Sequence, residues 1–173
     1  MLILRDVLGF SGGEVAEALE TDPASVYSAL QRAHAAVDQR LPALSQQATL
    51  RSLGDPRLRE IVGRYVQAWE DNDVHAVAAM LSHDARLAMP PTPTWYLGRD
   101  AIAAGMRGHA LSGRLRWRMA PTRANAQLAV TAQVWDHAAA AFVPHHTAVL
   151  TLRGELIDEV TAFLAPAAVA MGV

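Results

Sequence analysis

Residues 89–100 read Met89-Pro90-Pro91-Thr92-Pro93-Thr94-Trp95-Tyr96-Leu97-Gly98-Arg99-Asp100, and the rest of the chain is interpreted around them. The three prolines exclude a helix here and favour an extended backbone. Two large aromatic residues follow, and Asp100 is a candidate N-cap for a helix that begins at Ala101. The stretch predicts one wall of an apolar pocket, or alternatively a surface loop held by its aromatic side chains.

Two helices and a strand are predicted before this stretch. Asp55 and Pro56 combine an N-cap residue with a proline at the first helical position, and apolar residues follow at helical spacing as far as Trp69. Asp73 caps a shorter helix. The apolar residues that come next alternate with polar or small ones, as in a strand, and are Ala85, Leu87 and Met89.

A helix from about residue 100 to 110 and four strand-like segments are predicted after the proline-rich stretch. Alternating apolar and polar residues mark the first three segments, over 115–119, 128–135 and 145–152. Gly154 and Glu155 provide a hairpin turn into the last segment, 156–164. This order predicts an α+β domain over residues 57–173, in which helices pack on one face of a strongly curved antiparallel sheet and form a cone around a cavity.

Residues 1–42 predict a separate helix-turn-helix. Ser11 and Glu14 form a capping box at the start of one helix, and Asp22-Pro23 starts a longer one. Two short helices around a tight turn, the second with a polar face, are typical of DNA-binding modules. The polar face of the second helix carries Ser25, Tyr27, Ser28, Gln31 and Arg32. Residues 43–56 are polar, with turn residues at both ends, and predict a linker.

Composition and charge exclude several kinds of functional site and of cellular location. The 173 residues contain no cysteine, so disulfides, thiolate metal sites and cysteine nucleophiles are excluded. The net charge is −2, and residues 1–42 carry three arginines against six carboxylates, which offers few cations for phosphate contacts. No apolar run is long enough to span a bilayer and no signal peptide is recognisable, so a cytoplasmic protein without membrane contact is expected.

The first segment resembles a known family. Residues 2–11, Glu14-Val15-Ala16 and the run Val26-Tyr-Ser-Ala-Leu-Gln-Arg-Ala33 are similar to region 4 of bacterial extracytoplasmic-function sigma factors. That resemblance implies recognition of the −35 promoter element by Ser25, Tyr27, Ser28, Gln31 and Arg32, with promoter DNA and RNA polymerase core as partners. The upstream domain of that family, region 2, has no counterpart in this sequence, so a truncated regulator is expected.

The second segment resembles the SnoaL-like branch of the ketosteroid-isomerase and limonene-epoxide-hydrolase superfamily. Several motifs are similar to the C-terminal extension of a sigma-factor subgroup that fuses region 4 to a SnoaL-like domain. These motifs are Tyr65-Val-Gln-Ala-Trp69, Met89-Pro-Pro, Thr94-Trp-Tyr, Gly98-Arg-Asp-Ala-Ile102, Pro121-Thr-Arg-Ala-Asn125 and Glu159-Val-Thr-Ala-Phe-Leu164. The resemblance implies that this domain modulates the sigma activity.

Acid–base candidates in the cone are few. His145 and His146 are adjacent on a strand, so strict alternation lets only one of them face the cavity. Asp136 lies at a strand end and Asp158 beside a turn, and both are weaker candidates. By strand order, the carboxylate pair and arginine of limonene-epoxide hydrolases fall on Thr131, Gln133 and Ala162, so that activity is not expected. No residue cluster has metal-ligand spacing, and neither a metal nor a cofactor is predicted.

An excess of tryptophan and methionine around the cone favours a pocket for a medium-sized apolar molecule. Thr131, Gln133 and one histidine, assigned to His146, would supply its polar contacts. The other predicted lining residues are large and apolar, and several double as ordinary core: Trp69, Met80, Met89, Trp95, Tyr96, Met106, Trp117, Trp135 and Phe163.

Three functional interpretations follow. The first is a sigma-factor-like transcription regulator that combines −35-type DNA recognition with a SnoaL-like domain binding a small apolar ligand or modulating the sigma activity. The second is an enzyme, a cyclase, isomerase or hydrolase acting on a polyketide- or terpenoid-like substrate, with a vestigial helix-turn-helix. The third is an inactive fragment of a longer sigma factor. A homodimer is a further candidate assembly.

Overall fold

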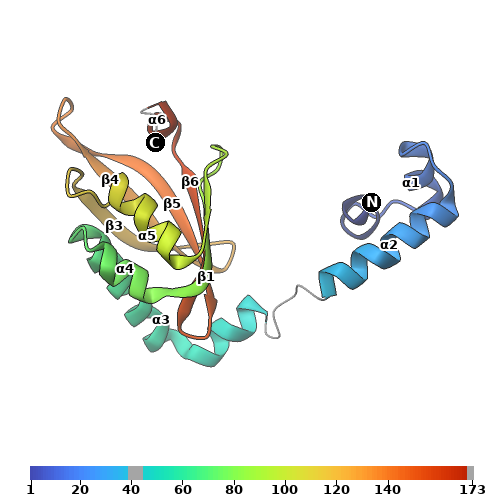
Figure 1. The fold of residues 1–173 in the computed structure, drawn as a ribbon, viewed down its shortest axis with the longest axis horizontal. Coiled ribbons are helices and arrows are strands. Elements are labelled where there is room, and N and C mark those ends of the chain that lie inside the picture. Colours follow the sequence, from blue (N-terminus) through green and yellow to red (C-terminus); the bar gives the residue numbers. More distant parts are fainter. Residues whose placement is uncertain (39–44, 171–173) are drawn as a thin grey trace. The chain divides into compact units, whose positions relative to one another are not determined.

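The chain divides into two compact units, residues 1–45 and 46–173. The computed structural model describes residues 1–38 and 45–170, and Figure 1 shows both units. The predicted end of the first domain at residue 42, and the start of the linker at residue 43, lie outside the described residues. Each unit is described by itself.

The described part of the first unit contains one π-helical turn and two α-helices. These are η1 (Ile3–Val7), α1 (Gly12–Ala18) and α2 (Pro23–Asp38). The predicted capping box is present, because the Glu14 amide donates to the Ser11 hydroxyl and the Glu14 carboxylate accepts from the Ser11 amide. A small core holds α1 and α2 together and consists of Val15, Ala16, Val26 and Leu30.

Helix α3 (Gln46–Glu70) occupies most of the predicted linker. Thr49 and Leu50 are buried, and the Gln46 side-chain oxygen accepts from the Leu152 amide. The apolar side chains on this short helical segment attach it to the sheet, so residues 46–56 belong to the second unit. Gly54, at φ 70° and ψ 160°, interrupts the helix at the position where the sequence predicted a new helix start.

A short helix leads from α3 into the first strand. The Asp73 carboxylate accepts hydrogen bonds from the amides of His75 and Ala76 and caps α4 (Val74–Met80), as predicted. Strand β1 (Leu81–Ala88) follows directly.

The proline-rich stretch forms a tight loop between two strands. The Met89 amide donates to the Thr94 carbonyl, and β2 (Trp95–Leu97) runs antiparallel to β1. The prediction of an extended backbone was therefore wrong for the loop and correct for β2. The N-cap of α5 (Arg99–Gly108) is Gly98, at φ 90°, and not Asp100, which lies in the first turn. A carboxylate there still interacts favourably with the helix dipole.

The second unit is built on a six-stranded sheet of order β2-β1-β6-β5-β4-β3. Its other strands are β3 (Trp117–Ala124), β4 (Gln127–Asp136), β5 (Ala141–Arg153) and β6 (Leu156–Leu164). The pairing of β1 with β6 is parallel and all other pairings are antiparallel. A short helix, α6 (Pro166–Ala170), follows β6. Helices α3, α4 and α5 pack on one face of the curved sheet, and the main core lies between these layers (Figure 1).

Candidate ligand pocket

An apolar pocket opens between helices α3 and α5 and the concave face of the sheet, with a volume of about 160 Å³. The lining contains no arginine, lysine, aspartate or glutamate. Its members come from two helices, α3 and α5, from every strand except β4, and from adjoining loops, and are Tyr65, Trp69, Leu87, Met89, Thr94, Tyr96, Gly105, Met106, His109, Ala110, Trp117, His145, His146, Val160, Ala162 and Leu164.

Five buried rings make up the floor of this pocket: Tyr65, Trp69, Trp117, His145 and His146. The indoles of Trp69 and Trp117 meet edge to face, with centroids 5.2 Å apart. The His145 ring lies 4.9 Å from the Trp117 ring, and the His146 ring 5.6 Å from the Trp69 ring. Edge contacts of this kind hold aromatic rings in fixed relative positions. The floor is therefore a rigid, polarisable surface.

Both histidines reach the pocket because β5 carries a bulge. Ala132 of β4 pairs with His146 while Gln133 pairs with Pro144, so His145 has no partner on β4. A bulge re-aims side chains that strict alternation would send to opposite faces of the sheet. The expectation that only one histidine can face the cavity was wrong for this reason.

The two imidazoles form a neutral, hydrogen-bonded pair with Nδ1 atoms 2.9 Å apart. Burial lowers the pKa of His145, and burial together with the neighbouring His145 lowers the pKa of His146 to about 3. Between neutral rings, one Nδ1 must carry the shared proton and the other must accept it. The first ring then has a bare Nε2 and the second an Nε2–H. No other described residue hydrogen-bonds to either ring, so the pair retains one free acceptor and one free donor.

Two further polar groups of the floor lack full hydrogen bonds. Tyr65 and Trp69 lie one helical turn apart on α3, which directs both rings toward the sheet. No described residue lies at full hydrogen-bonding geometry to the buried Tyr65 hydroxyl or to Trp69 Nε1, although the two groups lie close enough to interact with each other. Burial raises the pKa of the Tyr65 phenol, and the nearby Trp69 indole offsets only part of that effect. The hydroxyl therefore remains a protonated potential donor.

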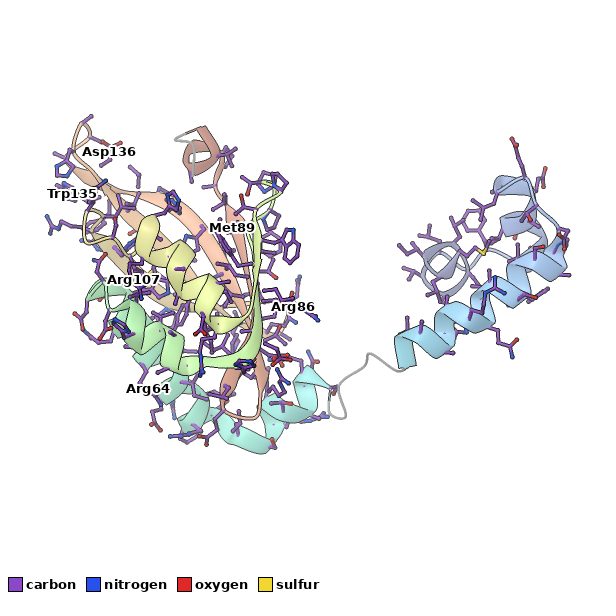
Figure 2. All side chains as sticks on the ribbon, in the orientation of Figure 1. Arg64, Arg86, Met89, Arg107, Trp135 and Asp136 are labelled. Atoms are coloured by element: carbon purple, nitrogen blue, oxygen red, sulfur yellow. The ribbon has the colours of Figure 1, made fainter. Side chains whose placement is uncertain are left out.

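Partly exposed residues and the exposed His109 surround the mouth of the pocket, the former being Met89, Thr94, Tyr96 and Gly105. Figure 2 shows Met89 at the end of β1, on the side of the sheet where α5 lies. The Tyr96 ring packs directly on α5 at Gly105, where an added Cβ would lie 2.7 Å from Tyr96 Cζ. The missing side chain of Gly105 is thus what allows β2 and α5 to approach at the entrance.

The structure brings six of the predicted lining residues together in this pocket, namely Trp69, Met89, Tyr96, Met106, Trp117 and His146. Met80 is buried core outside the lining. Tyr65, His109 and His145 also line the pocket and were not predicted to do so. The helical spacing of 58–69 marked Tyr65 as core, but it gave no sign that its hydroxyl would lack a full hydrogen bond.

The remaining predicted lining residues lie away from the pocket, because strand alternation places them on the opposite face of the sheet. Trp95 pairs with Ala88 and is 67% exposed, while its neighbour Tyr96 pairs with the buried Leu87. Thr131 pairs with Thr147, which pairs with Phe163, and this ladder borders a second hollow, which His146 also lines. Gln133 borders the same hollow, and Trp135 contacts the Arg116 guanidinium.

Neither carboxylate candidate for catalysis reaches the pocket. Asp136 accepts hydrogen bonds from the amides of Ala138 and Ala139 in the β4–β5 turn, at the tip of the hairpin in Figure 2. Asp158 hydrogen-bonds to Ser82 and pairs with Arg153. Both carboxylates have structural partners outside the pocket lining.

The predicted DNA-binding residues all lie on the exposed surface of α2: Ser25, Tyr27, Ser28, Gln31 and Arg32. Ser25 also bonds through its hydroxyl and amide to the Asp22 carboxylate, which stabilises the start of α2. The Tyr27 ring lies against Gly12 of α1. His34 is paired with Asp6 of η1 at 2.6 Å, so it is not a free cation on this surface.

The described part of the chain was compared with the requirements of a metal-binding cluster and of a membrane-spanning helix. Within residues 1–38 and 45–170, no group of three or more His, Asp or Glu side chains could hold a metal ion. No helix in these ranges has the length and apolarity needed to cross a bilayer.

Helices packed on one face of a curved sheet around an apolar pocket define an α+β domain with the form of a cone. The chain belongs to the SnoaL-like domain family, whose model matches residues 62–169. The predicted SnoaL-like fold is thereby confirmed for the second unit.

Solved structures of this fold have little sequence in common with the chain. An NTF-2-like protein of Burkholderia xenovorans is 16% identical with a TM-score of 0.53, covering 70% of this chain and 96% of that one. An epoxide hydrolase of Mycobacterium tuberculosis that resembles limonene-epoxide hydrolases is 15% identical with a TM-score of 0.51, covering 68% and 89%. At these identities the likeness shows the fold alone.

A sequence relative extends across both units. The extracytoplasmic-function RNA polymerase sigma factor SigG of M. tuberculosis is 29% identical over 167 residues, which cover 95% of this chain and 44% of SigG. The chain therefore spans less than half the length of this relative.

Proposed function

We propose that this protein is a sigma-factor-like transcription regulator, in which the first unit recognises a −35-type promoter element and the SnoaL-like unit binds a small apolar ligand. The observation that carries the proposal is the similarity to SigG, because it covers 95% of the chain and so includes both units. A relationship confined to the SnoaL-like fold would cover residues 62–169 alone.

The surface of α2 supports recognition of DNA by the first unit. Tyr27, Gln31 and Arg32 are exposed, while Val26 and Leu30 on the opposite face are buried against α1. This division leaves a polar helix face free to enter a major groove. The low number of cations predicts modest affinity with a shallow salt dependence, because each neutralised phosphate adds to that dependence.

The experiment is fluorescence anisotropy of the chain with a labelled duplex that contains a −35 element, at about 50 and 200 mM salt. We expect sequence-selective binding that weakens with salt and is lost in Arg32→Ala. Arg59→Ala, an exposed arginine of the second unit, removes the same charge and should leave binding unchanged. Absence of binding at low salt, or equal losses in both variants, would contradict recognition by α2.

The pocket supports ligand binding by the second unit. It is lined by apolar and aromatic groups and contains no side chain of fixed charge. Such a site favours an uncharged molecule, because an ion would lose its hydration without finding a counter-ion. We propose that occupation of the pocket changes the affinity of the first unit for promoter DNA. Repeating the anisotropy experiment with and without a pocket ligand measures this change in affinity.

An enzyme is the second candidate, and the His145–His146 pair is the observation that favours it. A neutral donor–acceptor pair in the lining of the pocket can exchange protons with a bound substrate. This candidate predicts that the wild-type protein converts a neutral ring compound into a product. Mass spectrometry of the reaction mixture detects that product. Product formation should be lost, with binding retained, in His145→Gln combined with His146→Gln.

A further inference from the structure

We propose that the SnoaL-like unit carries a second nucleic-acid contact, in which Arg116 and Arg118 on the outer face of the sheet bind phosphates of duplex DNA. These two arginines and the rings of Trp135 and Phe142 beneath them form what we call the arginine surface. The choice of duplex DNA among polyanions rests on the proposed function. The contact itself goes beyond that function, which assigns promoter recognition to α2 alone.

The distribution of charge along the chain favours this surface. Residues 111–135 contain four arginines and no carboxylate, whereas residues 1–42 carry three arginines against six carboxylates. Phosphate contacts provide most of the sequence-independent affinity of a protein for DNA. The first unit offers few of the cations that such contacts need, and the arginine surface supplies them from the second unit.

Strand alternation places both arginines on the outer face of the sheet. Trp117 between them is buried, and Arg116 and Arg118 are exposed. Arg116 lies just before β3, where its carbonyl accepts from the Trp135 amide and continues the pairing with β4. Residues two apart on an extended strand leave the same face roughly 7 Å apart. The two guanidinium groups can therefore contact the same stretch of a phosphate backbone.

Aromatic rings hold both guanidinium groups. The Arg118 guanidinium carbon lies 4.0 Å from the centroid of the Phe142 ring. The Arg116 guanidinium carbon lies 5.2 Å from the centroid of the Trp135 ring. The two rings meet edge to face, with centroids 5.2 Å apart, and so form one platform. A guanidinium on an aromatic face keeps its N–H donors directed outward, so this platform orders the arginines and leaves their donors free for an anion.

Arg116 and Arg118 make no ion pair within the described residues. Three other arginines of the second unit do form ion pairs, namely Arg57, Arg123 and Arg153. Like charges on the same face of a strand repel each other. Two neighbouring cations without a carboxylate partner therefore favour an external anion, and bound phosphate relieves their repulsion.

The hollow beside Arg118 adds neutral hydrogen-bonding groups. Arg118 is the one side chain of fixed charge in its lining, which contains no carboxylate. The other polar side chains of the lining are Thr131, Gln133, His146 and Thr147. Arginine, threonine and glutamine are among the residues that commonly contact DNA phosphates. The hollow thus suits an anionic group, unlike the uncharged pocket on the concave face.

Fluorescence anisotropy of the full chain tests the contact, with the −35 duplex and a scrambled duplex of equal length, at several salt concentrations between about 50 and 200 mM. The deciding variant combines Arg116→Gln with Arg118→Gln. We expect its affinity to fall by the same factor for both duplexes. The slope of log affinity against log salt should decrease by about 2, since each lost phosphate contact removes about 1.

Two further double variants separate the contact from net charge. Arg59→Gln with Arg107→Gln removes the same charge from exposed positions on α3 and α5 and should leave affinity and slope close to those of the wild type. Arg116→Lys with Arg118→Lys keeps both charges but loses the forked guanidinium geometry, so the slope should be kept while the affinity falls. Circular dichroism and urea unfolding check that every variant is folded.

Three results would overturn the inference. They are an unchanged slope in the Arg116→Gln, Arg118→Gln variant, an equal decrease in the Arg59→Gln, Arg107→Gln control, and a loss confined to the −35 duplex. Vesicles containing phosphatidylserine provide a further arm. Loss of vesicle binding without loss of DNA binding would assign the surface to a membrane and would also refute the inference.

Arg32→Ala distinguishes this inference from the proposed function. It should abolish the preference for the −35 duplex and leave binding of the scrambled duplex unchanged. If Arg32→Ala changes nothing while the Arg116→Gln, Arg118→Gln variant loses affinity, recognition by α2 is refuted and the arginine surface stands. Absence of any duplex binding by the wild type at about 50 mM salt would refute both.

Discussion

His145 and His146 follow each other on strand β5, yet their Nδ1 atoms lie 2.9 Å apart and both rings line the same pocket. In a regular strand these side chains would lie on opposite faces of the sheet. The bulge at His145 changes that relationship and places two titratable groups, 5% and 7% exposed, against Trp69 and Trp117. The pair therefore connects protonation with the stability of the SnoaL-like unit.

The free energy of unfolding of that unit should fall between pH 7 and pH 5. The pKa values of both histidines are lowered in the folded chain, that of His146 to about 3, whereas an unfolded histidine titrates near pH ~6.5. Below pH ~6.5 the unfolded state binds more protons, so stability is complete above this pH and is lost as the pH falls toward 3. For His146 alone we expect a loss of about 2 kcal/mol by pH 5.

Urea unfolding followed by tryptophan fluorescence measures this loss, because all four tryptophans belong to the second unit. The ion-paired carboxylates Asp84 and Glu155 also have lowered pKa values, but the stability they contribute is lost only at lower pH, near the range where carboxylates titrate. The double variant His145→Gln, His146→Gln should be less stable at pH 7 and show a flatter pH dependence. Equal pH dependence in the two proteins would contradict the assignment.

Much of the second unit could be predicted because its signals are local. The apolar spacing of 58–69 and the Asp73 cap depend on neighbouring residues, and both predicted elements are present. The alternation in β4 and β5 predicted strands correctly, but assigning faces requires the register. Thr131 was placed in the cavity, whereas its pairing with Thr147 directs it to the outer face.

The chemistry of the pocket could not be predicted in the same way, because it depends on contacts between distant segments. The bulge at His145 arises from the pairing of β5 with β4, and neither strand has a glycine there to mark it. Tyr65 was recognisable as a core residue, but whether its hydroxyl has a partner depends on which strand residues face α3. Gly105 was also overlooked, since its role depends on Tyr96 across the pocket mouth.

Tyr65→Phe should stabilise the ligand-free chain. The hydroxyl is fully buried and no described residue lies at full hydrogen-bonding geometry to it, so its removal eliminates a desolvated polar group and breaks only a weak interaction with Trp69. We expect a gain of about 1 kcal/mol in the free energy of unfolding. Thermal and urea unfolding measure it, with Tyr96→Phe as the near-neutral control. A destabilised Tyr65→Phe protein would mean that the hydroxyl has a partner in solution.

Gly105→Ala should damage the mouth of the pocket, because the new methyl group would lie 2.7 Å from Tyr96 Cζ. The Tyr96 ring must shift, and we expect a destabilisation of about 1 kcal/mol together with weaker binding of a small apolar probe such as ethylbenzene. Gly108 is the matched control on the same helix, since an added Cβ there meets nothing within 4 Å. Gly108→Ala should be neutral or slightly stabilising. Similar effects of both substitutions would show that helix propensity, and not contact with Tyr96, determines the result.

Gly12→Ala tests whether the position of Tyr27 matters for promoter binding. A Cβ at Gly12 would lie 2.6 Å from the Tyr27 hydroxyl, the far end of an exposed side chain that can move without disturbing the core of the first unit. Gly13→Ala adds the same methyl group next to it, with 4.0 Å to its nearest neighbour, the Ser11 hydroxyl. We expect both variants to keep the helical circular dichroism of the wild type. Anisotropy with the −35 duplex should then show a several-fold loss of affinity for Gly12→Ala alone.

If both variants bind like the wild type while Tyr27→Ala does not, Tyr27 contacts DNA from a position that does not depend on Gly12. If Tyr27→Ala also binds normally, the DNA-contacting surface of α2 must be assigned without Tyr27.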